Sequence, residues 1–264
     1  MTITLALALN MRRMLKSNNL VRKLQASETM GAVTVICTDK TGTLTENRMK
    51  VNDVRCLKEE GRDSAISHQP SALFKAIALN TTAMHDVGNP TEQALLQWLM
   101  EQGVDYQHLR EENTITAREP FSTERKYMST TVGDTIYIKG APEVVMARCT
   151  LSDDERHELE QQLLDWQNHA MRTLAVAQNE ELLAIFAISD PLRKEVPAAI
   201  RQCNEAGIDV KIVTGDTVAT AMEIARQCGL DPSRENCITG AEFAALSDEE
   251  EKSRWLWQAN TLTW

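Results

Sequence analysis

Residues 38–45 combine one carboxylate with hydroxyl, lysine and glycine residues in an order that suits phosphoryl transfer. They read Thr-Asp-Lys-Thr-Gly-Thr-Leu-Thr. The apolar stretch 32–37 precedes them and predicts a strand, buried on both faces, whose end presents Asp39. A carboxylate placed there, beside Lys40, can attack a phosphoryl group and form a covalent intermediate. An ordered run of seven such residues is specific, whereas an Asp-Lys pair alone would indicate nothing.

A second segment has the same design. Residues 208–214 predict a buried strand, and Thr214-Gly215-Asp216 follow it. Asp216 or Thr217 is expected to cap a helix that Gly229 ends. The carboxyl ends of parallel strands meet at one edge of a sheet, where ligands bind, so this segment is expected to lie near Asp39. By itself it would be interpreted as a turn and a helix cap, but Asp39 upstream favours a functional role.

Composition narrows the class of protein. The chain has 264 residues, enough for one large domain or two smaller ones. Its 28 basic and 38 acidic residues disfavour a nucleic-acid partner. The six cysteines form no Cys-x-x-Cys pair and the five histidines no metal-ligand spacing, which predicts free thiols in a soluble, intracellular protein. The sequence has no Gly-Lys-Ser/Thr phosphate loop, so another device must hold any nucleotide.

The first 27 residues differ in charge from the rest. Five basic residues and no acid give residues 1–27 a charge of +5 within a chain of net charge −10. The apolar run 3–9 is too short to span a bilayer and lacks the features of a signal peptide. Two interpretations stay open: the cytosolic end of a membrane helix with a basic stalk, or an amphipathic helix that covers a core.

The middle of the chain predicts an antiparallel sheet with helices, an α+β arrangement. Within it, Asn89 is a natural N-cap, Pro90 suits the first helical position, and Glu92 falls where a capping box places an acid. The simplest organisation is a parallel-sheet domain that an inserted domain interrupts. The expected boundaries are 1–27, 28–48, 49–189 for the insertion, 190–248 for the resumed parallel domain, and 249–264 as an atypical tail.

The chain resembles the large cytoplasmic loop of the P-type cation-transporting ATPases, and within that family it is most similar to the calcium pumps. Segments that follow the family's order run along most of the chain around Asp39. They are Asn18–Arg22, Glu28–Gly31, Thr91–Leu95, Phe121-Ser122, Arg125-Lys126, Met128-Ser129, Lys139–Glu143, Leu174-Ala175, Asp190-Pro191, Arg193 and Thr214–Asp216. The resemblance implies a haloacid-dehalogenase-like α/β phosphorylation domain, incomplete here, and an inserted α+β nucleotide-binding domain.

The resemblance also implies a mechanism. Asp39 would attack the γ-phosphate of ATP, with Mg²⁺ held by Asp39 and by the backbone carbonyl of Thr41. Phosphatases of this fold usually carry an aspartate as general acid at the position of Thr41. A threonine cannot act in that way, which disfavours a soluble phosphatase and lets the acyl phosphate persist. Thr214, Gly215 and Asp216 would donate hydroxyl and N–H groups to the phosphoryl oxygens.

The inserted domain would bind the adenosine end of ATP. Phe121 would stack on adenine, unless it is an ordinary core phenylalanine. Glu92 would hydrogen-bond the adenine amine or the ribose, although helix capping also explains it. The remaining contacts would come from Lys126, Lys139 with Gly140, and Arg172. Some calcium-pump relatives have an arginine two residues after the phenylalanine, where this chain has Thr123; Arg125 is a possible substitute, but its alternation with Lys126 points it the other way.

Other parts of the family pattern lie outside this sequence: the Thr-Gly-Glu loop, the Gly-Asp-Gly-x-Asn-Asp segment with its Mg²⁺ carboxylate, and the membrane carboxylates that select the ion. The parallel sheet is therefore expected to be short of strands. Two functions stay open: the phosphorylated part of an ATP-driven pump, or a nucleotide-binding module without turnover. The implied partners are ATP, a transported cation, calcium or another, and the pump's membrane and actuator domains. This portion would be cytoplasmic in a full-length membrane protein.

Overall fold

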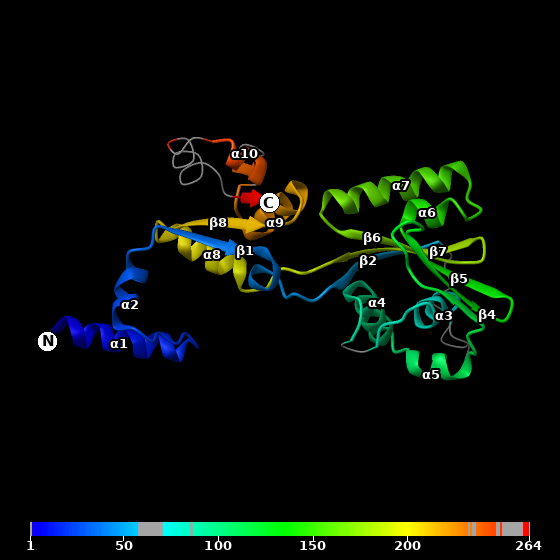
Figure 1. Ribbon diagram of the computed structural model, residues 1–264, viewed down its shortest axis with the longest axis horizontal. Coiled ribbons are helices and arrows are strands. Elements are labelled where there is room, and N and C mark those ends of the chain that lie inside the picture. Colours follow the sequence, from blue (N-terminus) through cyan, green and yellow to red (C-terminus); the bar gives the residue numbers. More distant parts are fainter. Residues whose placement is uncertain are drawn as a thin grey trace. The chain divides into compact units, whose positions relative to one another are not determined.

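The computed structural model describes residues 2–57, 71–84, 87–231, 233, 236–246, 249 and 261–263 (Figure 1). The chain divides into two compact units. The discontinuous unit comprises Met1–Lys40 and Lys194–Trp264, and the inserted unit comprises Thr41–Arg193. The tail expected at 249–264 falls mostly outside the described residues.

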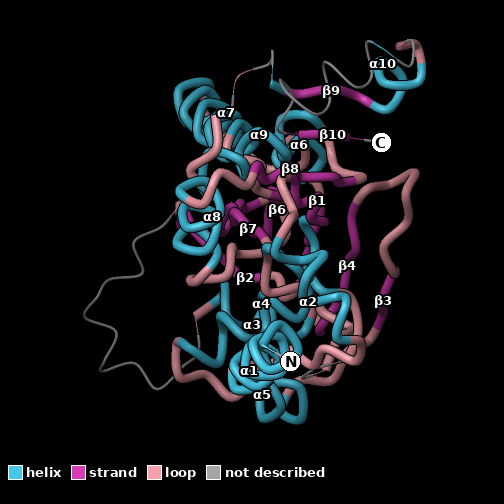
Figure 2. Tube along the Cα trace, turned by 90° about the vertical axis from the view of Figure 1, so that its left-hand side faces the viewer, coloured by secondary structure: helices cyan, strands magenta, loops and turns pink. Residues whose placement is uncertain are grey.

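The discontinuous unit contains a four-stranded parallel sheet, as the sequence predicts. Its strands are β1 (Val35–Asp39), β8 (Asp209–Thr214), β9 (Cys237–Thr239) and β10 (Thr261–Thr263). The order is β1-β8-β10-β9, which can be followed from bottom to top in Figure 2. All three neighbouring pairs are parallel, so their carboxyl ends lie at one edge of the sheet.

The helix that follows β8 has the caps that the sequence predicts. The helices of this part are α8 (Val196–Glu205), α9 (Val218–Cys228) and α10 (Gly240–Ala244). The side chain of Thr217 accepts the N–H of Thr220 at the start of α9. Gly229 ends the helix with a φ of 79°, in the left-handed region where glycine has no steric penalty. Thr217, rather than Asp216, is therefore the N-cap.

The prediction that the first strand is buried on both faces is wrong. Ile36 is 37% exposed, and both Cys37 and Asp39 are exposed. β1 forms one edge of the sheet, and the described helices of this unit pack mainly on β8, β9 and β10. An apolar, β-branched strand marks where a sheet forms, but neighbouring elements decide how much of it is covered.

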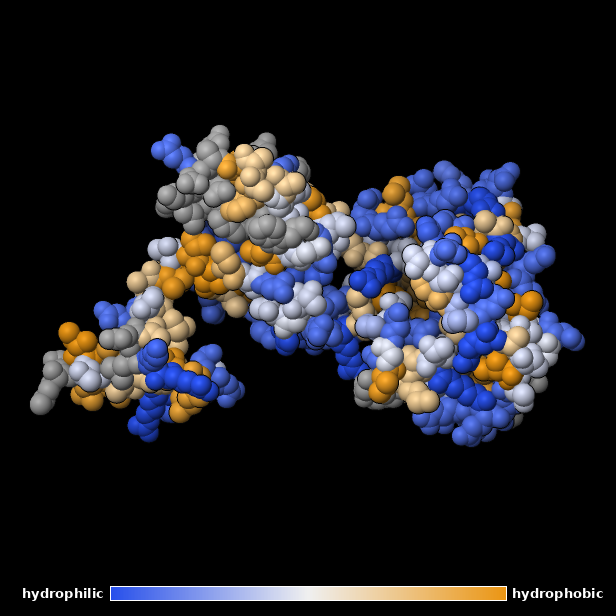
Figure 3. Space-filling model, viewed as in Figure 1, coloured by the Kyte–Doolittle hydropathy of each residue, from blue (hydrophilic) through white to orange (hydrophobic). Residues whose placement is uncertain are grey.

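The first two helices present apolar side chains at the surface. They are α1 (Thr2–Lys16) and α2 (Leu24–Gly31). Ile3, Leu5 and Leu9 are all more than half exposed on α1, and hydrophobic colouring covers much of this region in Figure 3. Among the described residues, no helix is both long and apolar enough to cross a bilayer.

The inserted unit is built on a six-stranded antiparallel sheet, which confirms the predicted α+β arrangement. Its order is β2-β7-β6-β5-β4-β3. The strands are β2 (Lys50–Cys56), β3 (Ala117–Glu119), β4 (Tyr127–Val132), β5 (Thr135–Gly140), β6 (Arg172–Gln178) and β7 (Glu181–Ser189). The helices are α3 (Ala72–Leu79), α4 (Pro90–Glu101), α5 (Tyr106–Glu112), α6 (Pro142–Met146) and α7 (Asp153–Asn168).

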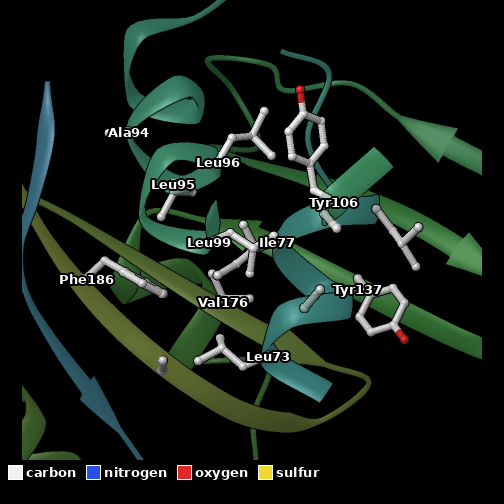
Figure 4. Close-up of a cluster of buried hydrophobic side chains, with 14 of the residues drawn as sticks. Leu73, Ile77, Ala94, Leu95, Leu96, Leu99, Tyr106, Tyr137, Val176 and Phe186 are labelled. Atoms are coloured by element: carbon white, nitrogen blue, oxygen red, sulfur yellow. The ribbon is translucent and has the colours of Figure 1, made fainter. Parts of the chain in front are cut away.

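Two apolar cores cover the faces of this sheet. Figure 1 shows α3, α4 and α5 on one face and α6 and α7 on the other. On the first face, Ile77 of α3 and Leu95 and Leu99 of α4 point toward Phe186 of the sheet (Figure 4). On the second, Leu159 and Trp166 of α7 pack over the sheet. The two cores make the sheet a rigid platform for the polar residues described below.

Candidate functional site

Asp39 and the Thr214–Asp216 segment lie at the same edge of the parallel sheet. Asp39, the last residue of β1, is in register with Val213 of β8. The segment Thr214–Asp216 therefore starts one residue beyond the level of Asp39. The hydroxyl oxygen of Thr214 accepts the N–H of Asp216 at 3.2 Å, which closes the turn. The carboxylate of Asp39 and a polar turn thus share one edge.

Two charges beside Asp39 are tied together. Lys40 forms an ion pair with Asp216, across the ends of β1 and β8. Asp39 itself accepts the backbone N–H of Lys40 through Oδ1 at 2.7 Å. The lysine that follows Asp39 thus links the two predicted phosphate-binding segments.

The loop after Asp39 is fixed by contacts within the inserted unit. The hydroxyl of Thr45 donates to Asp190 at 2.6 Å, and the other oxygen of Asp190 accepts the N–H of Arg48 at 3.0 Å. The guanidinium of Arg193 donates to the carbonyls of Thr45 and Gly42 at 3.0 and 3.1 Å. Thr41, the predicted Mg²⁺ ligand, is exposed at the start of this loop.

A buried ion pair lies at the predicted adenosine end. Lys139 of β5 donates to Glu92 of α4 at 2.7 Å, and both residues are at least 90% buried. The ammonium also donates to the hydroxyl of Thr81 at 3.0 Å. The second oxygen of Glu92 accepts the N–H groups of Thr82 and Ala83 and the Thr82 hydroxyl, at 2.9–3.0 Å. The pair therefore holds the turn that follows α3.

These bonds correct the capping-box prediction for Glu92. Asn89 is the N-cap of α4, as predicted, and its side chain accepts the N–H of Thr91 at 2.9 Å. Glu92 occupies the third helical position, but its carboxylate bonds to Lys139 and to residues 82–83. A tertiary ion pair has replaced the local bond because it neutralises a buried carboxylate.

Burial and pairing act on the two pKa values. Burial would raise the pKa of Glu92, but the Lys139 ammonium and the hydrogen bonds hold that pKa below its ordinary value. Burial lowers the pKa of Lys139, and although Glu92 opposes this shift, Arg110 and Arg118 add to it. The surroundings thus favour the charged form of Glu92 and disfavour the charged form of Lys139.

The register of the strands places three other predicted nucleotide contacts at the same end of the antiparallel sheet. Lys126 precedes β4, Gly140 ends β5 opposite Tyr127, and Arg172 starts β6. Lys126 has a φ of 58° and forms a 3.4 Å ion pair with Glu143. Phe121 is 61% exposed, which contradicts the core alternative for this residue and leaves its ring face accessible.

Close packing alone explains why residue 140 is a glycine, without any contact to a ligand. A Cβ at this position would lie 2.4 Å from the carbonyl oxygen of Lys126 and 2.5 Å from the Cβ of Tyr127. Arg125 is likewise engaged: it pairs with Glu119 at 2.7 Å and donates to the carbonyl of Pro120 at 2.9 Å. Arg125 therefore braces the turn that carries Phe121.

Sequence reasoning missed Thr81 and Arg110. Arg110 lies on α5, a helix that the sequence analysis did not predict, and it donates to the carbonyls of Ala78, Thr81 and Ala83. The available signal was Asp105, whose side chain caps this helix by accepting the N–H groups of Gln107 and His108. The contacts themselves join segments about 30 residues apart, which no local pattern predicts.

Comparison with known proteins gives a consistent result. Residues 71–185 match the family model described as P-type ATPase, cytoplasmic domain N. The calcium-transporting ATPase 7, plasma membrane-type, of Oryza sativa subsp. japonica is 36% identical over 95% of this chain. The human plasma membrane calcium-transporting ATPase 3 is 34% identical over 92% of it. The chain spans 29% and 25% of the lengths of these two relatives.

A solved structure supports the fold. A zinc-transporting PIB-type ATPase in its E2.Pi state matches with a TM-score of 0.60 over 80% of this chain and 30% of its own. The sequence identity is 23%, so this likeness bears on the fold alone.

Proposed function

We propose that this chain, which belongs to the P-type ATPase family, is the part of an ATP-driven cation pump that binds ATP and is phosphorylated on Asp39. The observation that carries the proposal is the register of β1 and β8, which brings Asp39 and Thr214–Asp216 to one sheet edge. We propose the same domain division as the sequence suggests, with residues 49–189 as the nucleotide-binding insertion.

In the proposed reaction a carboxylate oxygen of Asp39 attacks the γ-phosphorus of ATP. A bond forms between this oxygen and phosphorus, the bond to the β–γ bridging oxygen breaks, and ADP leaves. The hydroxyl of Thr214 and the backbone N–H of Gly215 would donate to the phosphoryl oxygens. The Lys40–Asp216 ion pair would keep the carboxylate of Asp216 from repelling the incoming phosphate.

The residues present fit a Mg²⁺ ion that arrives with the nucleotide. Such ions are usually held by one or two carboxylates together with substrate phosphates. Among the described residues no group of three or more His, Cys, Asp or Glu gathers, so a dedicated metal cage is not the expected arrangement. Asp39 and the carbonyl of Thr41 would hold the ion, which when bound supplies positive charge to the phosphoryl oxygens.

At the adenosine end, we propose that Phe121 stacks on the base and that Lys126 and Arg172 meet the phosphates. The exposed ring of Phe121 supports this role. Lys139 would offer a hydrogen bond from a fixed position, whereas Glu92 would act mainly by holding Lys139. Calcium is the proposed cargo because the two relatives reported above are named calcium-transporting. The membrane and actuator parts of the pump would be its partners, and this portion would face the cytoplasm.

Two measurements test the proposal. Calorimetric titration with ATP and Mg²⁺ should show binding that Phe121→Ala and Lys139→Ala weaken, while a control at the partly exposed Lys75, Lys75→Ala, leaves it unchanged. Incubation with γ-labelled ATP should give an acid-stable, hydroxylamine-labile label that Asp39→Asn abolishes. Binding without any label would favour a nucleotide-binding module without turnover. A folded chain that does not bind ATP would contradict the proposal.

A further inference from the structure

The turn that follows α3 is held from both sides by charged side chains. On one side, Arg110 donates three hydrogen bonds, to the carbonyls of Ala78, Thr81 and Ala83 at 2.8, 2.9 and 3.0 Å. On the other, Glu92 accepts the N–H groups of Thr82 and Ala83. The last carbonyls of a helix carry partial negative charge and lack helical partners, so a guanidinium is a favourable partner for them.

This turn connects Arg110 to the buried lysine. Thr81, 1% exposed, accepts a hydrogen bond from Lys139 with its hydroxyl and one from Arg110 with its carbonyl. Arg110 therefore fixes the backbone of the residue whose side chain holds the ammonium. With Glu92 as the second acceptor, two of the three N–H groups of Lys139 are directed by the protein.

The cluster also carries an excess of positive charge. Lys139 interacts electrostatically with one acid, Glu92, and with two further cations, Arg110 and Arg118. Arg118 donates to the carbonyl of Leu79 at 2.9 Å, at the same helix end. Three cations around one carboxylate leave a net positive centre in a unit of an acidic protein, an arrangement that favours an anionic ligand.

We propose that Arg110 is a positioning residue for nucleoside triphosphate binding: by tying the carbonyls of residues 78–83, it sets the position of Thr81 and hence of the Lys139 ammonium. The proposal rests on the nucleotide-binding function proposed above. Arg110 is not expected to touch the nucleotide. The planar fork of arginine suits three carbonyls in a way that the single ammonium of lysine does not.

The test compares Arg110→Gln and Arg110→Lys with the unchanged chain and with Arg55→Gln. Arg55 is a partly exposed arginine of the same unit whose 2.6 Å ion pair with Glu158 involves α7, on the other face of the sheet. Titration calorimetry with ATP, at a temperature where circular dichroism shows each variant folded, gives the affinity. We expect Arg110→Gln to weaken ATP binding about tenfold, the loss of about 1.4 kcal/mol. Arg110→Lys should restore part of it, and Arg55→Gln should have no effect.

A second readout separates positioning from general destabilisation. In Arg110→Gln, hydrogen exchange should speed up at the amides of Thr82 and Ala83 and stay unchanged in β6 and β7. Removing Arg110 also removes a charge that lowers the pKa of Lys139, so the alkaline limit of ATP binding should move to higher pH. Arg110→Lys keeps the positive charge, so in this variant the alkaline limit of ATP binding should stay at the same pH.

The outcomes are distinct. Wild-type ATP affinity in a folded Arg110→Gln chain would overturn the proposal. If Arg110→Gln does not fold, Thr81→Val replaces it, because valine removes the acceptor for Lys139 at nearly equal volume; unchanged ATP affinity in this variant would also overturn the proposal. If the unchanged chain binds no ATP, the proposed function fails, while faster exchange at residues 82–83 would still establish Arg110 as the residue that holds the turn.

Discussion

Lys40 pairs with Asp216 across the carboxyl ends of two parallel strands, so the residue after the proposed nucleophile is bound to the last residue of the proposed phosphate-binding turn. The ammonium is well buried and the carboxylate is about one-third exposed. The pair links segments that are 176 residues apart in sequence, Lys40 to Asp216, and belongs wholly to the discontinuous unit. The ion pair therefore joins the ends of β1 and β8 and, at the same time, sets the charge beside Asp39.

The first prediction concerns the energy of this pair. Because Asp216 is partly exposed, solvent screens the interaction, and we expect a coupling energy of about 1 kcal/mol or less. Lys40→Met, Asp216→Asn and the double variant should form a non-additive cycle in urea unfolding. Lys40→Met should be the more damaging single change for phosphorylation, since it leaves a carboxylate facing the phosphate. Strict additivity of the two stability changes would show that the pair contributes nothing.

The sequence was most informative where the chemistry is local. The strand that ends at Asp39, the caps at Asn89 and Thr217, and the antiparallel sheet of the inserted unit depend largely on near neighbours, and the structure confirms those elements. Burial of β1 and the partners of Glu92 depend on tertiary packing, which no single-sequence pattern contains. Arg110 shows the same limit: its three acceptors lie on α3 and in the turn that follows it, 27–32 residues earlier. Local propensity predicts elements, whereas long-range polar networks need the fold.

The second prediction concerns the loop that carries Thr41. Thr45 is fully buried, accepts the N–H of Gly42 at 3.2 Å and donates to Asp190. Thr45→Val keeps the shape but removes both bonds, so it should lower the free energy of unfolding by about 1–3 kcal/mol. Thr43→Val, an exposed change in the same loop, is the control and should be nearly neutral. Equal stability of the two variants in urea unfolding would contradict the role given to Thr45.

The third prediction separates two glycines that the sequence placed in the site. Gly215→Ala meets no atom within 4 Å and requires no left-handed backbone, so the chain should fold with unchanged thermal stability. Gly140→Ala would clash with Lys126 and Tyr127 and should cost about 1–3 kcal/mol. Loss of Asp39 labelling in a stable Gly215→Ala chain would then report on the phosphate site itself. A large drop in stability for Gly215→Ala would point instead to a structural role.

The last prediction concerns the buried Glu92–Lys139 pair. Glu92→Gln leaves the ammonium of Lys139 buried without its counter-charge, which should cost about 3–5 kcal/mol near neutral pH. Glu101→Gln, on the exposed face of the same helix, is the control. In the unchanged chain the depressed pKa of Glu92 gives stability that is present above its unfolded pKa of about 4.3 and is lost as the pH falls through the folded value.

The stability of the Glu92→Gln variant should depend on pH in the alkaline range, whereas the contribution of Glu92 is lost in the acidic range. Without Glu92 the pKa of Lys139 falls further, so the unfolded state binds more protons than the folded state up to the ordinary lysine pKa of about 10.4. The stability of Glu92→Gln should therefore rise between neutral pH and pH of about 10, and by more than that of the unchanged chain. Urea unfolding at several pH values measures both slopes. A loss that does not diminish at alkaline pH would mean that Lys139 finds another acceptor, and that the pair is not what keeps its charge in the core.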